Sequence, residues 1–178
     1  MVFDYKGVGI LQNESELKLL SYMFDTNKIK NYLEIGTYLG GTMIYFDDLI
    51  KDGFLCSIDI TEAYKTTFSK NNISLKNKHM FITGNSFDES TINKVRDLNL
   101  EFDMLFIDGD HESDSALKDY QNYSKFVRKG GLIVFDDIRY PSVRECYNIA
   151  LGKDADSNII LSDTPSFPNY NGFGIIRK

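Results

Sequence analysis

The chain lacks the features that would direct it into or across a membrane. None of its apolar runs approaches the ~20 residues needed to cross a bilayer. Its first residues, MVFDYKGVGILQNESELK, do not contain the basic region and apolar stretch of a secretory signal. Cysteine is scarce, and neither Cys56 nor Cys146 has a partner at a spacing typical of zinc or redox sites. These absences predict a cytoplasmic protein with two buried free thiols and no membrane partner.

Positive charge is also in the minority. Lys and Arg number 20 against 26 Asp and Glu, a formal net charge of −6. Because nucleic-acid-binding surfaces are usually basic, a nucleic-acid partner is disfavoured. The sequence has neither a GxSxG motif nor a Ser/His/Asp set, so covalent hydrolase chemistry has no basis. The length of 178 residues predicts one domain over 1–178, with an N-terminal helical segment (1–30) and a core (31–178).

Proline is absent before Pro141, and short apolar runs alternate with longer amphipathic ones. The apolar runs carry few polar residues until their last positions, which is typical of parallel strands covered on both faces. The amphipathic runs predict helices, including one from Asn13 as a cap, one at 41–51 that stops before Gly53, and one through 114–131. The predicted fold is a doubly wound, Rossmann-like α/β sheet. Its expected parallel strands are 31–36, 54–60, 79–84, 102–108 and 131–137.

The C-terminal part breaks this alternation. Two apolar runs, 157–163 and 172–178, are separated by a link with two prolines, TPSFPNYN, which cannot form a crossover helix. Strands joined without a helix pair in the antiparallel sense. The sequence therefore predicts seven strands, of which the last two form an antiparallel pair at one edge.

The first predicted strand leads into a glycine-containing turn, EIGTYLGGT, and then a helix. Glycines at such a turn allow positive φ and close backbone approach. A dinucleotide fingerprint would need glycine at position 38, which is Tyr38. The remaining pattern, Glu34-x-Gly36-x-x-x-Gly40, resembles motif I of class I S-adenosylmethionine-dependent methyltransferases. The sheet of that family also ends in an antiparallel pair, so the resemblance covers nearly the whole chain.

This resemblance implies S-adenosylmethionine as the cofactor. The acidic residue would hold the amino group of the cofactor, and the glycine turn would pass beneath its methionine part. Asp59 ends the second strand about 20 residues after the turn, where a carboxylate can accept from both ribose hydroxyls. Ser86 matches a serine that binds adenine in the catechol-type enzymes. The expected cofactor-binding residues are Glu34, Gly36, Thr37, Tyr38, Gly40, Thr42, Asp59, Ile60, Asn85, Ser86 and Asp108.

Three aspartates end neighbouring strands. Asp108 ends the fourth strand, and Asp136 and Asp137 end the fifth, so all three project at the edge where α/β sheets bind ligands. Like charges this close repel unless a cation or shared protons compensate, and oxygen ligands suit a hard ion such as Mg²⁺. The resemblance extends to metal-dependent O-methyltransferases of the catechol, caffeoyl-coenzyme A and sugar types, which place aspartates at these positions. Asp108, Asp136 and Asp137 are thus expected metal ligands, although the same aspartates could line the cofactor pocket of a metal-free enzyme.

The proton acceptor has two candidates. The catechol-type enzymes use a lysine three residues after the first metal aspartate, and this chain has His111 there, a residue able to take a proton near neutral pH. Some sugar O-methyltransferases assign the role to an aspartate two residues on, which is Asp110 here. The sequence leaves both open, together with a local structural role for His111.

The predicted function is methyl transfer from S-adenosylmethionine to the hydroxyl of a small acceptor, such as a sugar or a phenol. Three alternatives remain: a metal-free N- or C-methyltransferase, a nicotinamide-dependent oxidoreductase, and a non-catalytic module that binds the cofactor. Acceptor recognition is expected from the N-terminal segment, from 61–78 and 138–158, or from a neighbouring subunit of a homo-oligomer.

Overall fold

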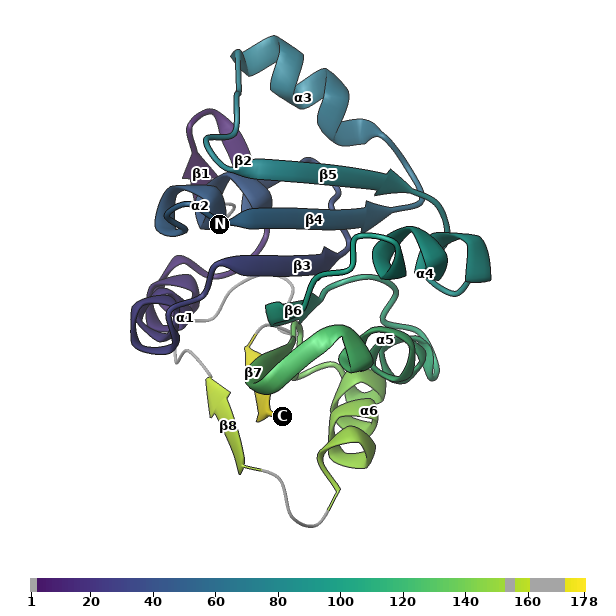
Figure 1. Cartoon of the computed structure of the whole chain (residues 1–178). Helices are drawn as coiled ribbons and strands as arrows, with labels where there is room; N and C mark the ends of the chain where they lie inside the picture. Colours follow the sequence, from purple (N-terminus) through teal and green to yellow (C-terminus); the bar gives the residue numbers. More distant parts are fainter. Residues whose placement is uncertain (1–2, 153–155, 161–171) are drawn as a thin grey trace.

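Parallel strands form the centre of the main sheet. The computed structural model describes residues 3–152, 156–160 and 172–178. Within these ranges the strand order is β5-β4-β3-β6-β7-β9-β8 (Figure 1), and β9 pairs antiparallel with both β7 and β8. The seven-stranded prediction with its antiparallel terminal pair is confirmed. The strands are β3 (Asn31–Ile35), β4 (Phe54–Asp59), β5 (Lys78–Thr83), β6 (Phe102–Ile107), β7 (Val127–Phe135), β8 (Asp156–Ile160) and β9 (Phe173–Arg177).

Helices cover both faces of this sheet (Figure 1). Alternate strand residues point to opposite faces. Tyr32 therefore packs with α1 and α2, whereas Leu33 belongs to the core shared with α4, α5 and α6. The helices are α1 (Glu14–Asn27), α2 (Gly41–Leu49), α3 (Ala63–Asn71), α4 (Glu89–Arg96), α5 (Ser115–Tyr123) and α6 (Pro141–Leu151), with a short 3₁₀ turn η1 (Ser124–Phe126). The described residues include no helix with the length and apolar content that spanning a bilayer requires.

The N-terminal segment differs from the helical expectation for 1–30. Between residues 3 and 30 only α1 is helical, and it begins at the predicted cap, where the Asn13 side chain accepts from the Ser15 N–H at 3.0 Å. Before it, β1 (Phe3–Tyr5) and β2 (Val8–Ile10) form an antiparallel hairpin. The hairpin packs on α2 so closely that a β-carbon at Gly41 would lie 2.8 Å from Ile10 Cγ1. Strands of three residues carry too little pattern to be predicted, and contact with α2 stabilises them.

Two predicted helix ends were wrong. The α2 helix ends at Leu49 because Ile50 is extended, and Gly53 lies instead against the carbonyl of Lys30. The predicted helix 114–131 ends at Tyr123, and Val127 begins β7 opposite Phe102. Pairing with β6 overrides the helical pattern there.

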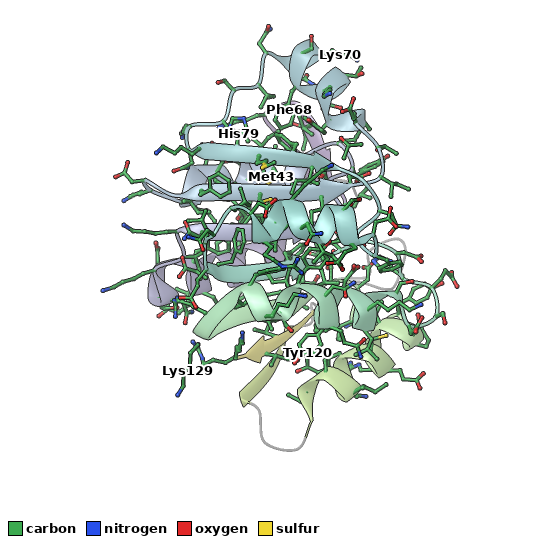
Figure 2. All side chains as sticks on the ribbon, turned by 45° about the vertical axis from the view of Figure 1, so that its right-hand side comes forward. Met43, Phe68, Lys70, His79, Tyr120 and Lys129 are labelled. Carbon is green, nitrogen blue, oxygen red and sulfur yellow. The ribbon has the colours of Figure 1, made fainter. Side chains whose placement is uncertain are left out.

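Strand β5 forms one edge of the main sheet, and helix α3 packs against it. Phe68 of α3 packs edge-on against Phe81 of β5, with ring centroids 5.7 Å apart. His79, labelled with Phe68 in Figure 2, is exposed on β5, and its Nδ1 lies 3.0 Å from the Asn77 carbonyl oxygen. His79 therefore has a local structural contact on an exposed part of the sheet.

Candidate active site

The loops that follow β3, β4, β5 and β6 enclose a cavity of about 560 Å³ at the carboxyl edge of the sheet. This volume lies within the range of small-molecule sites. The cavity brings together most of the residues predicted to bind a cofactor, although they are far apart in the sequence. Those that line it are Gly36, Tyr38, Asp59, Ile60, Asn85, Ser86 and Asp108.

The glycine turn is shaped by close approach of two backbones. Gly36 has φ of +98°, and a β-carbon there would lie 1.9 Å from the carbonyl oxygen of Asp108. Gly40 has φ of +82°, and a β-carbon on it would lie 2.5 Å from the Phe68 ring. Side chains are disfavoured at such φ values even without a clash. Both glycines are therefore required by the fold of this turn.

Asp59 ties the glycine turn to β4. Its Oδ2 accepts from the backbone N–H of Tyr38 at 2.8 Å, and its Oδ1 accepts from the N–H of Thr61 at 2.7 Å. Each carboxylate oxygen can accept more than one hydrogen bond. Asp59 can therefore hold the turn and still accept from the hydroxyls of a ligand in the cavity.

Glu34, a predicted cofactor-binding residue, lies beneath the turn and does not line the cavity. Its side chain is fully buried, and its two oxygens accept from the hydroxyls of Tyr32 at 2.8 Å, Thr42 at 2.9 Å and Ser57 at 2.7 Å. Thr37 in turn hydrogen-bonds Ser57. The Glu34 carboxylate thus links the glycine turn to β3 and β4. It would act on a ligand only indirectly, by orienting these hydroxyls.

Thr37 and Thr42, also expected at the cofactor, line a second, smaller hollow of about 30 Å³. The N-terminal residues 9–12 form its other wall, and Gly36, Tyr38 and Asp108 border both cavities. The hollow is large enough for a water molecule or two. Its position extends the main cavity between the glycine turn and the N-terminal segment.

Burial makes stability depend on the protonation of Glu34. Desolvation raises the pKa of this carboxyl to about 7 even though Ser57, Tyr32 and Thr42 donate to it. The folded state therefore holds a proton that the unfolded chain releases near pH 4.5. This contribution to stability is complete below pH 4.5 and is lost as pH rises through about 7, a total of about 3 kcal/mol.

We therefore expect Glu34→Gln to flatten part of the pH dependence of unfolding. The unfolding free energy of wild type minus that of the variant should fall by about 3 kcal/mol between pH 4.5 and pH 8.5, because the amide does not titrate. Urea unfolding at several pH values measures this difference. Glu145→Gln, the same change at an exposed position of α6, serves as the control. Parallel curves for wild type and Glu34→Gln would contradict the assignment.

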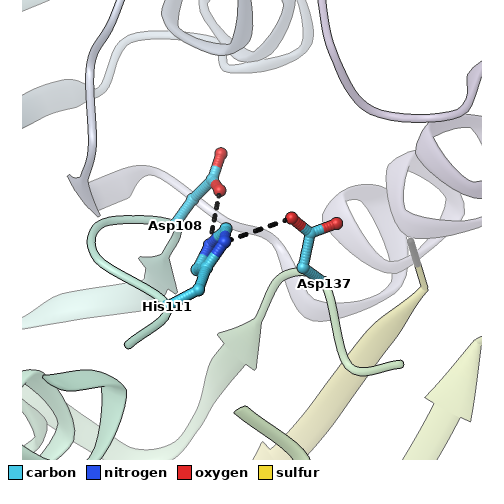
Figure 3. A group of neighbouring side chains, drawn as sticks. All are labelled: Asp108, His111 and Asp137. Atoms are coloured by element: carbon cyan, nitrogen blue, oxygen red, sulfur yellow. Dashed lines mark ion pairs between the residues drawn. The ribbon is translucent and has the colours of Figure 1, made fainter. Parts of the chain in front are cut away.

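An acidic group with a histidine at its centre lies beside the cavity (Figure 3). His111 Nε2 lies 3.5 Å from Asp108 Oδ1, and His111 Nδ1 lies 3.4 Å from Asp137 Oδ2. One ligand atom from each of the three residues lies within 4.8 Å of the others. Burial raises the pKa of Asp137, and the nearby His111 opposes this rise. The three side chains are partly exposed, so a ligand or an ion could reach them.

Asp136 is not one of these three residues, and its side chain accepts a hydrogen bond from Gln12. The Gln12 amide nitrogen donates to Asp136 Oδ2 at 2.5 Å and to Asp108 Oδ2 at 2.6 Å. Asp136 is only 3% exposed, and burial followed by the charges of Asp108 and Asp137 raises its pKa well above the usual range. One amide thus bridges two carboxylates that would otherwise repel. Sequence reasoning missed Gln12, since nothing in its local pattern indicates a contact 96 and 124 residues away.

Asp110, the other candidate base, lines the cavity but is engaged in its own loop. Its Oδ1 accepts from the Glu112 N–H at 3.1 Å, and its Oδ2 accepts from the Ser115 hydroxyl at 2.7 Å. The second bond anchors the first residue of α5. Asp110 therefore shapes the loop that carries His111.

A glycine turn after the first central strand, a carboxylate after the second and an acidic group after the fourth and fifth form one connected site. The protein family described as a methyltransferase domain matches residues 33–138, which is 106 of the 178 residues. The chain belongs to this methyltransferase family. The match begins within β3, continues past the end of β7 and includes each loop that lines the main cavity.

Other proteins share part of the sequence or the fold of this chain. An uncharacterized protein of Acanthamoeba polyphaga mimivirus is 35% identical over 127 residues, covering 68% of this methyltransferase-family chain and 57% of the viral protein. The chain thus spans little more than half of that relative. An O-methyltransferase from Bacillus cereus, solved with S-adenosylhomocysteine, superposes with a TM-score of 0.72 at 18% identity and covers 93% of this chain and 82% of its own. The O-methyltransferase TomG from Streptomyces achromogenes, solved with S-adenosylmethionine, gives 0.69 at 18% identity, with 93% and 80% covered.

Proposed function

We propose that the protein transfers a methyl group from S-adenosylmethionine to a hydroxyl oxygen of a small acceptor. The observation that carries this proposal is the 560 Å³ cavity, whose lining includes Asp59, Ser86 and Asp108. A nucleoside with a charged amino-acid tail fits such a cavity in size and in polarity. Bound S-adenosylmethionine supplies the methyl group from a sulfonium. The solved relatives named as O-methyltransferases with this cofactor or its product support the oxygen acceptor.

The chain's own residues would hold and align the two reactants. Asp59 would accept from the ribose hydroxyls, Ile60 and Ser86 would face the base, and Gly36 would allow the tail of the cofactor to approach the backbone. Methyl transfer requires an in-line arrangement of donor and acceptor, so positioning is the main contribution of the protein.

We assign the proton acceptor to His111. Its ring lies between the carboxylates of Asp108 and Asp137, which would stabilise the positive charge it gains on taking the proton of the acceptor hydroxyl. Asp110 is the weaker candidate, because its hydrogen bonds to Glu112 and Ser115 hold its side chain against its own loop.

We also propose that Asp108 and Asp137 hold a divalent ion. Asp108 and Asp137 offer oxygen ligands on both sides of His111, and Asp136, whose Oδ2 accepts from the Gln12 amide, could join them. A bound ion would stabilise the deprotonated hydroxyl of the acceptor. If His111 served as a third ligand, the donor set would suit Mn²⁺ better than Mg²⁺, and Asp110 would be left as the base.

Methyl transfer to hydroxylated acceptors tests the proposal. We expect labelled methyl groups to pass from S-adenosylmethionine to members of a panel of phenols and sugars, with at least a ten-fold loss in excess chelator and recovery with Mg²⁺ or Mn²⁺. Asp137→Asn should show a similar loss, and Asp114→Asn, at an exposed position, should not.

Other outcomes would assign the alternatives. Methyl transfer that is undiminished in excess chelator would show that the reaction needs no metal. Transfer to amines alone would identify a metal-free N-methyltransferase. Affinity for the cofactor without turnover on any acceptor would indicate a binding module.

A further inference from the structure

Helix α1 leaves two large apolar side chains uncovered on its outer face. Its inner face is closed, because Leu17, Leu20 and Phe24 are buried in the core. On the opposite face Leu19 is 55% exposed and Tyr22, one turn further along, is 73% exposed. Single exposed apolar residues are ordinary, but neighbours on one face of a helix form a patch that favours contact with another protein surface.

The spacing along this outer face is that of a seam between two helices. Ser15, Leu19, Tyr22 and Thr26 are all exposed and follow one another at intervals of four, three and four residues. The same intervals separate the core positions of a coiled coil. The Ser15 hydroxyl lies 2.7 Å from Asn13 Oδ1, and the Thr26 hydroxyl donates to the Tyr22 carbonyl oxygen at 3.2 Å. Covering this face would therefore leave neither hydroxyl proton without an acceptor.

One flank of this seam carries a positive and a negative side chain. Lys18 and Asp25 are exposed and lie about two turns apart, on the same side of the helix. Lys18 Nζ lies 2.7 Å from Glu14 Oε1 at the helix surface. Asp25 lies in the last turn of α1, which contains no basic residue. A carboxylate at the negative end of a helix is unfavourable unless a cation lies close to it.

We propose that α1 is the contact surface between two copies of this chain, packed antiparallel about a two-fold axis. With Leu19 opposite Tyr22 of the partner subunit, the two-fold axis brings the charged flanks of both helices together. Lys18 then lies beside Asp25 of the partner subunit, and the same pair forms a second time. A parallel pair would instead set this flank against the flank of Met23 and leave the charges unmatched. The inference goes beyond the proposed reaction and does not depend on it.

Sedimentation velocity of the full chain over a range of concentrations tests this inference. One pair of helices is a small interface, so we expect a weak dimer with a dissociation constant of roughly 10–100 μM. Tyr22→Asp places a charge in the seam and should raise this constant at least ten-fold. Ile149→Asp, the same kind of change at a 58% exposed position of α6, should leave it unchanged. Both sites are exposed, so melting temperatures close to that of wild type are expected for both variants.

Exchanging the charges on the flank tests the antiparallel arrangement itself. Lys18→Asp and Asp25→Lys should each weaken the dimer at low ionic strength, because each brings like charges together at both pairs. An equimolar mixture of these two variants should associate more tightly than either alone, since every pair then joins an acid to a base. A chain that stays monomeric at every concentration would overturn the inference. So would a dimer that survives Tyr22→Asp, or a mixture that associates no more tightly than its components.

Discussion

Replacing Gly36 with alanine is expected to abolish binding of the cofactor. The added β-carbon would lie 1.9 Å from the carbonyl oxygen of Asp108, and the residue would keep a φ of +98° that side chains rarely adopt. Neither the turn nor the Asp108 carbonyl can give way without moving the end of β3 or β6. We expect at least a 100-fold loss of affinity for S-adenosylhomocysteine, measured by calorimetry, together with a lower melting temperature.

Gly152→Ala provides a matched control for this prediction. Gly152 also has a positive φ, +62°, but nothing lies within 4 Å of the position a β-carbon would occupy. The substitution should therefore cost about 1 kcal/mol of stability through backbone strain and leave affinity unchanged. Equal affinities for wild type and Gly36→Ala would show that the turn does not shape the binding site.

Among the substitutions proposed, Gln12→Leu is expected to cause the largest loss in unfolding free energy. Leucine cannot donate to Asp108 and Asp136, so the partly buried Asp108 and the buried Asp136 lose their shared partner and repel each other. The expected loss in unfolding free energy is about 2–4 kcal/mol at pH 8, the range for a buried polar group left unsatisfied beside a charge. Chemical denaturation at pH 8 and pH 5 measures it.

The pH dependence gives the second half of this prediction. The pKa values of Asp108 and Asp136 are already raised by burial, so protonation of these carboxyls favours the folded state as pH falls. The effect of Gln12→Leu should therefore be smaller at pH 5 than at pH 8. Gln121→Leu, the same change at an exposed position of α5, should stay within about 0.5 kcal/mol of wild type at both pH values. A loss that is equal at pH 5 and pH 8 would mean that the two carboxylates do not cause it.

The sequence predicts those parts of the fold that repeat a local pattern. Apolar runs ending in polar residues located β3 to β7, and Asn13 was recognisable as a cap because capping is a contact between near neighbours. The carboxyl ends of parallel strands meet at one edge, so the proximity of Asp108 to Asp137 also followed from topology.

Contacts between distant segments were not predictable in the same way. The sequence did not predict the hydrogen-bond partners of Glu34. The register of β3 on β4 sets it opposite Ser57, and Tyr32 lies two residues before it on the same face. A strand pattern gives the face of a residue and not its partner on the next strand. Val127 is a second example of this limit. Its spacing fits the helical pattern predicted for 114–131, but pairing with Phe102 places it in β7.

The hydrogen bonds from Gln12 to Asp108 and Asp136 affect the order in which the protein folds during synthesis. Residue 12 emerges from the ribosome early, whereas Asp136 emerges 124 positions later. Closing a loop of that length carries an entropic cost, so this junction is expected to form after the neighbouring strands have assembled. During synthesis the nascent chain therefore carries an incomplete acidic edge, and Gln12 gains both of its carboxylate partners only after residue 136 has left the ribosome.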